Sequence, residues 1–283
     1  MYLTDECRDV ASWMERKAKE KIDDLKENGR DPGALAFVAD MDDPATASYV
    51  RAKEAACKRV GLRSVRIPLE LIREEFAYIP ADAGVILQAP YPQDVWTGLA
   101  EAIWPKQDVD GMFYTDGPCI SATALGIYFL LRYLYGDLLA GRPVTVLGRS
   151  KAVGWPIADM LCRQLDMEVT VVHSKTTADR FRSALLSQFI VSCIGKPCVV
   201  IKAWNVQSWG TYIDVGFARD ENGRPVGDVA PELADDIYKN RVTPVPGGVG
   251  PLTVAALMLN MAYRRSPFEL WKDMRDEIGD PLI

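Results

Sequence analysis

The stretch "RPVTVLGRSKAVGWPIADMLCRQL", residues 142–165, decides the fold class of this chain. It begins with a short apolar, β-branched run typical of a buried strand. A turn bounded by Gly148 and Gly154 follows, and then a helix. This order is typical of a dinucleotide site, because glycines let the backbone approach a pyrophosphate at a helix N-terminus. The spacing is G-x5-G rather than G-x-G-x-x-G, so a tight turn without a ligand stays open as the alternative.

The next strand of the series indicates which dinucleotide would bind. In NAD-preferring sites, an acidic residue at the end of the second strand binds the ribose 2′-hydroxyl. Here that strand, "EVTVVHSKT", ends in His173, Ser174, Lys175 and Thr176. An end without a carboxylate suits a 2′-phosphate, and Arg149 in the glycine turn adds a cation. The sequence therefore predicts NADP, with NAD less favoured. Although His173 is the single histidine, its place at a strand end favours a structural or cofactor-side role over catalysis.

Two series of strand and helix patterns run along the chain. After a charged helix at 5–28, strand patterns at 34–40, 63–69 and 83–92 alternate with helices, one of which ends at Gly61. A second series begins at 142 and ends before a last helix, "VAALMLNMAYRR". We expect an α/β fold of two domains, an N-terminal α/β catalytic domain and a Rossmann-like NAD(P)-binding domain, with a cleft between them. The expected division is 1–120 plus a C-terminal helix at about 255–283 for the first domain, and 121–254 for the second.

Composition narrows the function classes. The 283 residues carry a formal net charge of −6, which argues against a nucleic-acid partner. The start of the chain lacks the apolar segment of a signal peptide, and no apolar run approaches the roughly 20 residues of a membrane span. We therefore expect a cytoplasmic protein without a membrane partner. Six cysteines without a C-x-x-C pair and one histidine give no usual zinc pattern, so we expect no metal and reduced, packed thiols.

Tyr49 and Lys53 lie four positions apart in a predicted helix and therefore share one face of it. They could be an aromatic platform and a proton-handling amine, or an exposed polar stripe. Tyr-x-x-x-Lys also occurs in short-chain dehydrogenases, but there it follows the nucleotide fingerprint within one domain. Here it precedes the glycine turn and lies in the other α/β layer, which argues against that class.

Several motifs occur together in the order of one family, most specifically "YVRAK", "DVDG", "GRSKAVG" and "PGGVGP". From about residue 5 to the last predicted helix, the chain resembles the bifunctional methylenetetrahydrofolate dehydrogenase/methenyltetrahydrofolate cyclohydrolase family. The resemblance implies oxidation of 5,10-methylenetetrahydrofolate with NADP and hydrolysis of the methenyl product to 10-formyltetrahydrofolate. It also implies a homodimer acting on tetrahydrofolate one-carbon derivatives, in one-carbon metabolism and purine biosynthesis.

The same resemblance implies roles for individual residues. Lys53 would be the catalytic amine, Gln88 its partner, Tyr49 a stacking surface for the folate, and Asp110 the residue that binds the pterin. The implied substrate contacts are Tyr49, Thr46, Asp110, Pro246, Gly247 and Gly248. The implied cofactor contacts are Gly148, Arg149, Ser150, Val153, Gly154, His173, Ser174, Lys175, Thr176, Cys193 and Gly195.

The chemistry of hydrolysis fits these residue types. A free lysine, with a pKa of about 10.4, is too basic to accept a proton near neutral pH, but burial lowers the pKa of an amine. A carboxylate beside Lys53 would oppose that effect, whereas the neutral amide of Gln88 can orient the amine without fixing its charge. The alternatives are an ordinary solvated lysine for Lys53 and a turn aspartate for Asp110. Gln88 lies in an apolar strand pattern and needs partners there.

Two rival functions stay open. The first is a dehydrogenase of the same fold without hydrolase activity. The second is a non-catalytic folate- or dinucleotide-sensing protein, suggested by the unusual segment Cys119-Ile120-Ser121-Ala122, where the family usually has Cys-Thr-Pro.

Overall fold

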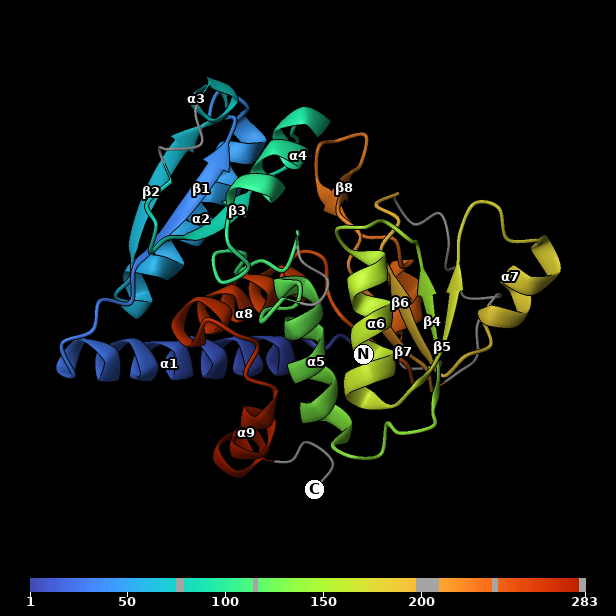
Figure 1. Ribbon diagram of the computed structural model, residues 1–283. Coiled ribbons are helices and arrows are strands. Elements are labelled where there is room, and N and C mark those ends of the chain that lie inside the picture. Colours follow the sequence, from blue (N-terminus) through green and yellow to red (C-terminus); the bar gives the residue numbers. More distant parts are fainter. Residues whose placement is uncertain (75–78, 114–116, 197–208, 236–238, 280–283) are drawn as a thin grey trace. The chain divides into compact units, whose positions relative to one another are not determined.

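The computed structural model of the chain describes residues 1–74, 79–113, 117–196, 209–235 and 239–279 (Figure 1). Residue contacts divide the chain into two compact units. The three-strand unit comprises Ser12–Ala122 and Val254–Phe268. The five-strand unit comprises Met1–Ala11, Thr123–Thr253 and Glu269–Ile283. Helix α1 (Thr4–Glu27) and helix α8 (Val249–Tyr263) each contribute residues to both units.

The three-strand unit is built on a parallel sheet with the order β2-β1-β3. Its strands are β1 (Ala34–Ala39), β2 (Arg63–Pro68) and β3 (Gly84–Leu87). The three strands expected in this part of the chain are thus confirmed, the third ending earlier than its sequence pattern. Helix α2 (Pro44–Val60) connects the first two strands, and α3 (Leu69–Glu74) and α4 (Gln93–Ala102) follow β2 and β3.

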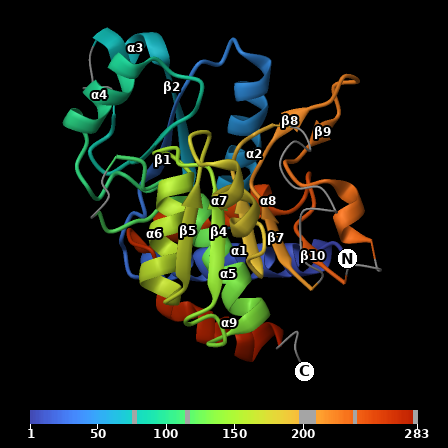
Figure 2. The same ribbon diagram turned by 90° about the vertical axis from the view of Figure 1, so that its right-hand side faces the viewer.

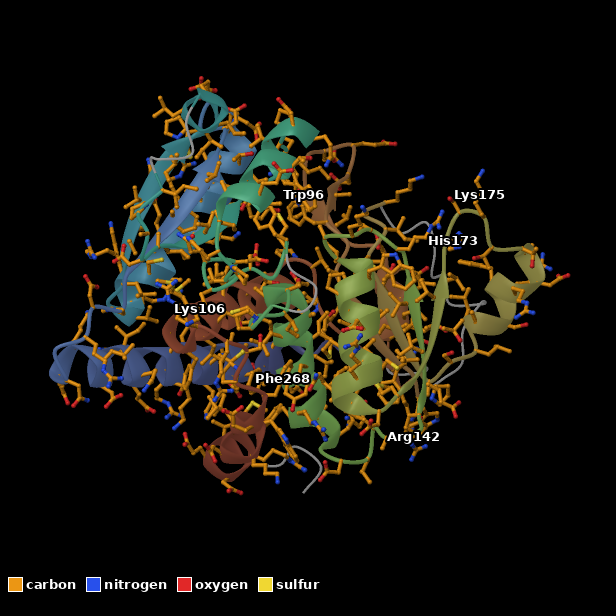
Figure 3. All side chains as sticks on the ribbon, viewed as in Figure 1. Trp96, Lys106, Arg142, His173, Lys175 and Phe268 are labelled. Carbon is orange, nitrogen blue, oxygen red and sulfur yellow. The ribbon has the colours of Figure 1, made fainter. Side chains whose placement is uncertain are left out.

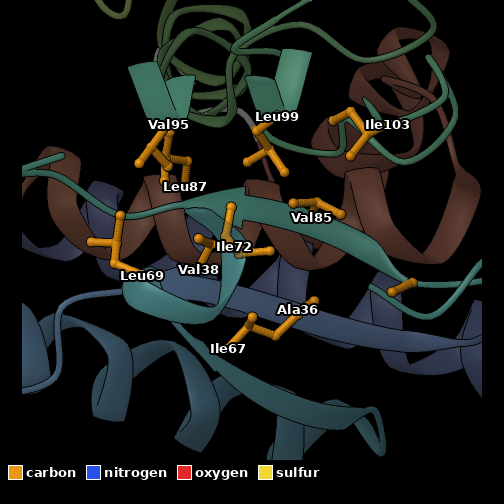
Figure 4. Packing of buried hydrophobic residues seen from close by; sticks show 11 residues of the cluster. Ala36, Val38, Ile67, Leu69, Ile72, Val85, Leu87, Val95, Leu99 and Ile103 are labelled. Atoms are coloured by element: carbon orange, nitrogen blue, oxygen red, sulfur yellow. The ribbon is translucent and has the colours of Figure 1, made fainter. Parts of the chain in front are cut away.

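The core of this unit lies where the sheet meets α3 and α4 (Figure 4). It consists of the buried apolar side chains of Ala36, Val38, Ile67, Leu69, Ile72, Ala83, Val85, Leu87, Val95, Leu99 and Ile103. Within β1 and β3, these residues alternate along the strand and so point to one face of the sheet. Burial of such side chains removes apolar surface from water, which stabilises each fully buried valine, leucine or isoleucine by roughly 1.5–3 kcal/mol.

The five-strand unit contains a parallel sheet with the order β10-β7-β6-β4-β5, whose strands run alongside one another in Figure 2. They are β4 (Pro143–Leu147), β5 (Glu168–Val172), β6 (Phe189–Ser192), β7 (Thr211–Asp214) and β10 (Arg241–Val242). From β4, the chain passes to β5 on one side and then to β6 on the other. The sheet therefore has a topological switch point between β4 and β6, where ligands of open α/β sheets bind.

Shorter elements complete the five-strand unit. Its helices include α5 (Ala122–Tyr135), α6 (Gly154–Leu165) and α7 (Ala178–Ala184). Strand β8 (Ala218–Arg219) pairs with β9 (Pro225–Val226) in an antiparallel hairpin. The described residues also form the 3-10 helices η3 (Pro231–Ala234) and η4 (Phe268–Leu270).

The helix that the sequence predicted to be the last begins earlier, at Val249, and is followed by another, α9 (Trp271–Ile278). The short, mostly charged sequence of α9 gives a weak local signal. Tertiary contacts hold it, since Met274 is buried and the guanidinium of Arg132 lies 4.6 Å from the ring centre of Trp271. Within the described part of the chain, no helix is both long enough and apolar enough to cross a membrane.

Candidate functional site

Helix α2 carries two of the predicted catalytic residues, and its ends are fixed by local sequence signals. The carboxylate of Asp43 caps the N-terminus by accepting the N–H of Thr46 at 2.8 Å, and Pro44 occupies the first turn. At the other end, Gly61 adopts a left-handed conformation, with φ of 81°, that glycine tolerates without strain. The predicted stop at Gly61 is confirmed. Tyr49 and Lys53 therefore lie one turn apart on a regular helix.

The amine of Lys53 meets the amide of Gln88. Lys53 Nζ donates a hydrogen bond of 2.9 Å to Gln88 Oε1 across 35 positions of sequence. Gln88 directly follows β3, and its own N–H donates to the carbonyl of Val38 at 2.9 Å. This bond continues the pairing of β3 with β1 and anchors the backbone that carries the amide. The structure thus brings Gln88 to Lys53 as a neutral hydrogen-bond acceptor.

Asp110 is brought near Lys53 and Gln88 by a short backbone pairing with β3. Asp108 forms a parallel bridge with Val85 of β3, and Val85 donates its N–H to the carbonyl of Gln107 at 2.7 Å. Because the two segments run parallel, the residues after Asp108 head toward the end of β3 where Gln88 lies. Asp110, two positions on, interacts electrostatically with Lys53 and accepts a backbone hydrogen bond from Ala122.

The turn aspartate of the "DVDG" motif is Asp108 rather than Asp110. The Asp108 carboxylate accepts the N–H groups of Met112 at 2.9 Å and Phe113 at 2.8 Å, which closes the turn. Gly111 has φ of 60°, and a Cβ there would overlap the backbone of Ile120. The local turn therefore uses Asp108 and Gly111 and leaves the Asp110 carboxylate for other contacts.

Burial governs the charges in this cluster. It lowers the pKa of Lys53 below the usual value, while the charge of Asp110 opposes the shift. Burial likewise raises the pKa of Asp110, opposed by Lys53. A carboxylate thus does stand near the amine, yet the net direction for Lys53 is downward. Burial raises the pKa of the Cys57 thiol to about 12, so it stays neutral one turn from Lys53.

The two other predicted residues of α2 differ in exposure. The Tyr49 side chain is 44% exposed, which leaves an aromatic surface accessible on the helix face of Lys53. Thr46 is only 1% exposed, its hydroxyl donates to Asp43 at 2.6 Å and it lies 3.3 Å from the carbonyl oxygen of Ala89. The structure gives Thr46 a part in holding the helix start beside the Gln88–Ala89 segment. Its contact with a substrate stays a prediction.

Tyr91 is a neighbour of this cluster that sequence reasoning did not single out. Its half-buried phenol lies 3.8 Å from Met112 Sδ, and burial together with the charge of Asp110 raises its pKa. The strand pattern at 83–92 includes this residue, but nothing in that stretch itself shows its proximity to Asp110.

The glycine turn of the five-strand unit lies at the switch point of the sheet. Gly148 has φ of 116°, and a Cβ on it would lie 2.9 Å from the carbonyl oxygen and 3.0 Å from Sγ of Cys193, just beyond β6. A Cβ on Gly154 would lie 2.5 Å from the carbonyl oxygen of Gly148. Ser150 Oγ accepts the N–H groups of Val153 and Gly154, each at 3.2 Å. Both glycines are thus needed for the close packing of the turn. Because they have no side chains, they also let a ligand approach the backbone at the start of α6.

The segment after β5 forms a closed turn, on which Figure 3 labels His173 and Lys175. The His173 N–H donates to Thr176 Oγ1 at 2.9 Å, and His173 Nδ1 accepts the N–H of Lys175 at 3.1 Å. With Nδ1 acting as an acceptor, the neutral ring carries its proton on Nε2. His173 therefore shapes the turn, while the side chains of Ser174 and Lys175 are exposed.

The remaining predicted site residues also belong to the five-strand unit. Cys193 Sγ donates to the carbonyl of Leu147 at 3.0 Å, and Gly195 follows with φ of 73°. Pro246, Gly247 and Gly248 directly precede α8, and Gly247 has φ of 100°. The structure thus collects Tyr49, Lys53, Gln88 and Asp110 in one unit and the glycine turn, the β5 end and the loop after β6 in the other.

The cysteines show no disulfide or metal pattern among the described residues. Cys7, Cys57 and Cys119 are buried free thiols, Cys193 is partly buried and Cys162 is exposed. Cys198 lies outside the described residues. Within the same ranges, no group of three or more histidine, cysteine, aspartate or glutamate side chains could hold a metal ion.

Comparison with known families gives two matches that together span most of the chain. Residues 6–110 match the catalytic domain of tetrahydrofolate dehydrogenase/cyclohydrolase. Residues 121–266 match the NAD(P)-binding domain of the same enzymes.

Individual proteins give the same result over longer stretches. The chain is 40% identical over 240 residues to the bifunctional protein FolD of Thermus thermophilus, covering 77% of this chain and 82% of that one. A crystal structure of the FolD methylenetetrahydrofolate dehydrogenase/cyclohydrolase from Campylobacter jejuni superposes with a TM-score of 0.80 at 28% identity, covering 93% and 98%. The Trypanosoma brucei enzyme, crystallised with NADP and an inhibitor, gives 0.78 at 28% identity, covering 93% and 96%.

Proposed function

Because the chain belongs to the tetrahydrofolate dehydrogenase/cyclohydrolase family, we propose that it catalyses both reactions of the family. It oxidises 5,10-methylenetetrahydrofolate to the methenyl form with NADP and hydrolyses the methenyl form to 10-formyltetrahydrofolate. The observation that carries the hydrolase assignment is the partly buried Lys53 amine, with a lowered pKa, hydrogen-bonded to the neutral amide of Gln88 at 2.9 Å.

Lys53 moves the proton during hydrolysis. As water adds to the cationic methenyl carbon, its proton passes to the neutral Nζ of Lys53. The same proton then passes to N5 of the folate as the bond between the methenyl carbon and N5 breaks. The hydroxyl of the intermediate releases its remaining proton to solvent as its oxygen becomes the formyl oxygen. Burial favours the neutral amine that the first step needs, and the Gln88 amide orients Nζ through its hydrogen bond.

Asp110 and Tyr49 bind the folate in this proposal. A carboxylate can accept paired N–H bonds from the amino-pyrimidine edge of a pterin, and Asp110 is partly buried beside Lys53. The exposed ring of Tyr49 offers a stacking surface on the same helix face. Stacking and the paired bonds would fix the reactive carbon relative to Lys53.

The five-strand unit fits a dinucleotide by two features of its own residues. The Gly148–Gly154 turn leads directly into the N-terminus of α6, the end of a helix that favours an anion. The exposed Arg149, Ser174 and Lys175 supply charge and hydrogen bonds for a 2′-phosphate. When bound, NADP supplies the nicotinamide ring that accepts the hydride.

Two separate assays test the function. We expect purified protein to form NADPH from methylenetetrahydrofolate and NADP, and to accelerate the loss of methenyltetrahydrofolate absorbance in the absence of NADP. NADPH formation with a hydrolysis rate equal to that of buffer would identify the chain as a dehydrogenase alone. Absence of both reactions, with either ligand still binding in calorimetry, would identify a sensing protein.

Replacement of Arg149 by alanine tests the cofactor preference. We expect KM for NADP to rise by about tenfold, a typical effect of removing one charge-assisted phosphate contact, while KM for NAD changes little. Arg163→Ala is the matched control, because Arg163 is an exposed arginine of α6 that pairs with Asp159 at 2.8 Å. If the ratio of KM for NADP to KM for NAD equals that of the original protein, Arg149 does not contact the 2′-phosphate.

We further propose that the protein is a homodimer of the cytoplasm that supplies one-carbon units for purine biosynthesis. In the same proposal, residues 1–120 and about 255–283 serve folate binding and 121–254 serve NADP binding. Light scattering of the purified protein would test the homodimer, with a monomeric mass contradicting it.

A further inference from the structure

Two buried aspartates of the five-strand unit have no role in the proposed chemistry. Asp214 ends β7 and Asp228 follows β9, and their exposed fractions are 3% and 0%. Charged carboxylates are rarely buried this completely unless hydrogen bonds satisfy them. Their hydrogen-bond partners therefore indicate what they stabilise.

Asp228 holds the loop that follows β6. Its Oδ2 accepts the hydroxyl of Ser192 at 2.7 Å and the N–H of Ile194 at 2.8 Å. Its Oδ1 accepts the N–H of Lys196, also at 2.8 Å. One carboxylate thus receives three hydrogen bonds from a stretch of five residues, and two of them fix the backbone on either side of Gly195.

Asp214 holds Asp228 in turn. Asp214 Oδ1 accepts the N–H of Asp228 at 3.1 Å, and Oδ2 accepts the N–H of Val229 at 2.9 Å. Both carboxylates lie against glycines: a Cβ on Gly216 would overlap the carboxylate of Asp228, and one on Gly227 would overlap that of Asp214. Because the two glycines have no side chains, the two carboxylates can pack directly against the backbone.

The loop that Asp228 fixes is the one that lies against the glycine turn. Gly148 packs on the carbonyl and thiol of Cys193, and the thiol donates to the carbonyl of Leu147 at 3.0 Å. A shift of residues 193–196 would therefore change one wall of the switch point between β4 and β6. The N–H groups of Ile194 and Lys196 already donate to the Asp228 carboxylate. A phosphate of the ligand would therefore be bound by the Gly148–Gly154 turn and α6.

We propose that Asp228 is a positioning residue for the cofactor: through Ser192, Ile194 and Lys196 it fixes the 193–196 loop in the arrangement that binds NADP. The inference rests on the proposed binding of NADP by the five-strand unit. It assigns Asp228 no contact with the cofactor itself.

The test uses Asp228→Asn in the full-length protein. An amide in place of the carboxylate turns an NH₂ group toward one of the three donors, so the loop loses at least one bond. We expect KM for NADP to rise about tenfold or more and the Kd for NADPH, from a fluorescence titration, to rise in parallel. The rate and KM of methenyltetrahydrofolate hydrolysis, which needs no NADP, should stay within twofold. Asp220→Asn is the matched control, since Asp220 accepts two backbone N–H groups in the exposed β8–β9 hairpin.

Ser192→Ala keeps the test decisive if Asp228→Asn does not fold. It removes the hydroxyl bond and leaves the carboxylate, and we expect a rise of about threefold in KM for NADP with hydrolysis unchanged. If Asp228→Asn folds, unchanged cofactor affinity in that variant would overturn the inference. If it does not fold, unchanged cofactor affinity in Ser192→Ala would overturn the inference. An equal loss of both activities in Ser192→Ala would also overturn it, because the role would then be general stability. If the original protein itself binds no NADPH, the proposed function fails instead.

Discussion

Replacing Lys53 by methionine should abolish hydrolysis of methenyltetrahydrofolate and leave NADP binding intact. Methionine is unbranched and apolar, so it can occupy the space of the partly buried lysine stem without a charge. It cannot accept a proton from water, and loss of a general base typically lowers a rate by about 10²–10⁴-fold. The Gly148–Gly154 turn belongs to the five-strand unit, whereas Lys53 belongs to the three-strand unit.

The measurement is the initial rate of methenyl absorbance loss, corrected for the buffer reaction, with Kd for NADPH as the second readout. Lys58→Met is the matched control, because Lys58 is an exposed lysine of α2. Lys53→Arg should be as inactive as Lys53→Met, since a guanidinium does not lose its proton in a protein. Ring opening at the original rate in Lys53→Met would disprove the assigned role.

Replacing Gln88 by glutamate should move the pH dependence of hydrolysis to higher pH. The new carboxylate would lie at the 2.9 Å position of the present amide oxygen and would stabilise the ammonium form of Lys53. An adjacent opposite charge typically shifts a pKa by about 1–3 units, here upward, against the lowering that burial causes. Below the pKa, the neutral fraction falls tenfold per unit, so the rate near neutral pH should fall by roughly 10–1,000-fold.

The measurement is the rate of hydrolysis from pH 6 to pH 9, with the buffer reaction subtracted at each pH. The hydrolysis rate of the original protein should rise with pH and level off once Lys53 is neutral. In Gln88→Glu, the rising part of the curve should lie at higher pH. Gln88→Met separates charge from orientation: it should lower the rate without moving the curve to higher pH. Superimposable curves for Gln88→Glu and the original protein would show that Lys53 is not the titrating group.

Local sequence signals were sufficient for much of the fold. The β-branched run at 143–147, the glycines at 148 and 154 and the helix after them are confirmed as β4, turn and α6, because each signal acts within a few residues. Helix α9 gave only a weak signal of this kind, because its sequence is short and mostly charged, and a contact between Trp271 and Arg132 of α5 helps to hold it. In the "DVDG" motif, sequence alone could not tell which aspartate closes the turn, and hydrogen bonds to Met112 and Phe113 assign this to Asp108.

The sequence by itself determined that Tyr49 and Lys53 share a helix face, because helical periodicity depends only on spacing. It did not determine whether that face meets water or protein. Only the tertiary structure placed the amide of Gln88 and the carboxylate of Asp110 beside the amine and removed much of its water. The pKa of a lysine depends on such desolvation and on charges brought from distant parts of the chain, and neither is encoded in the residues next to it.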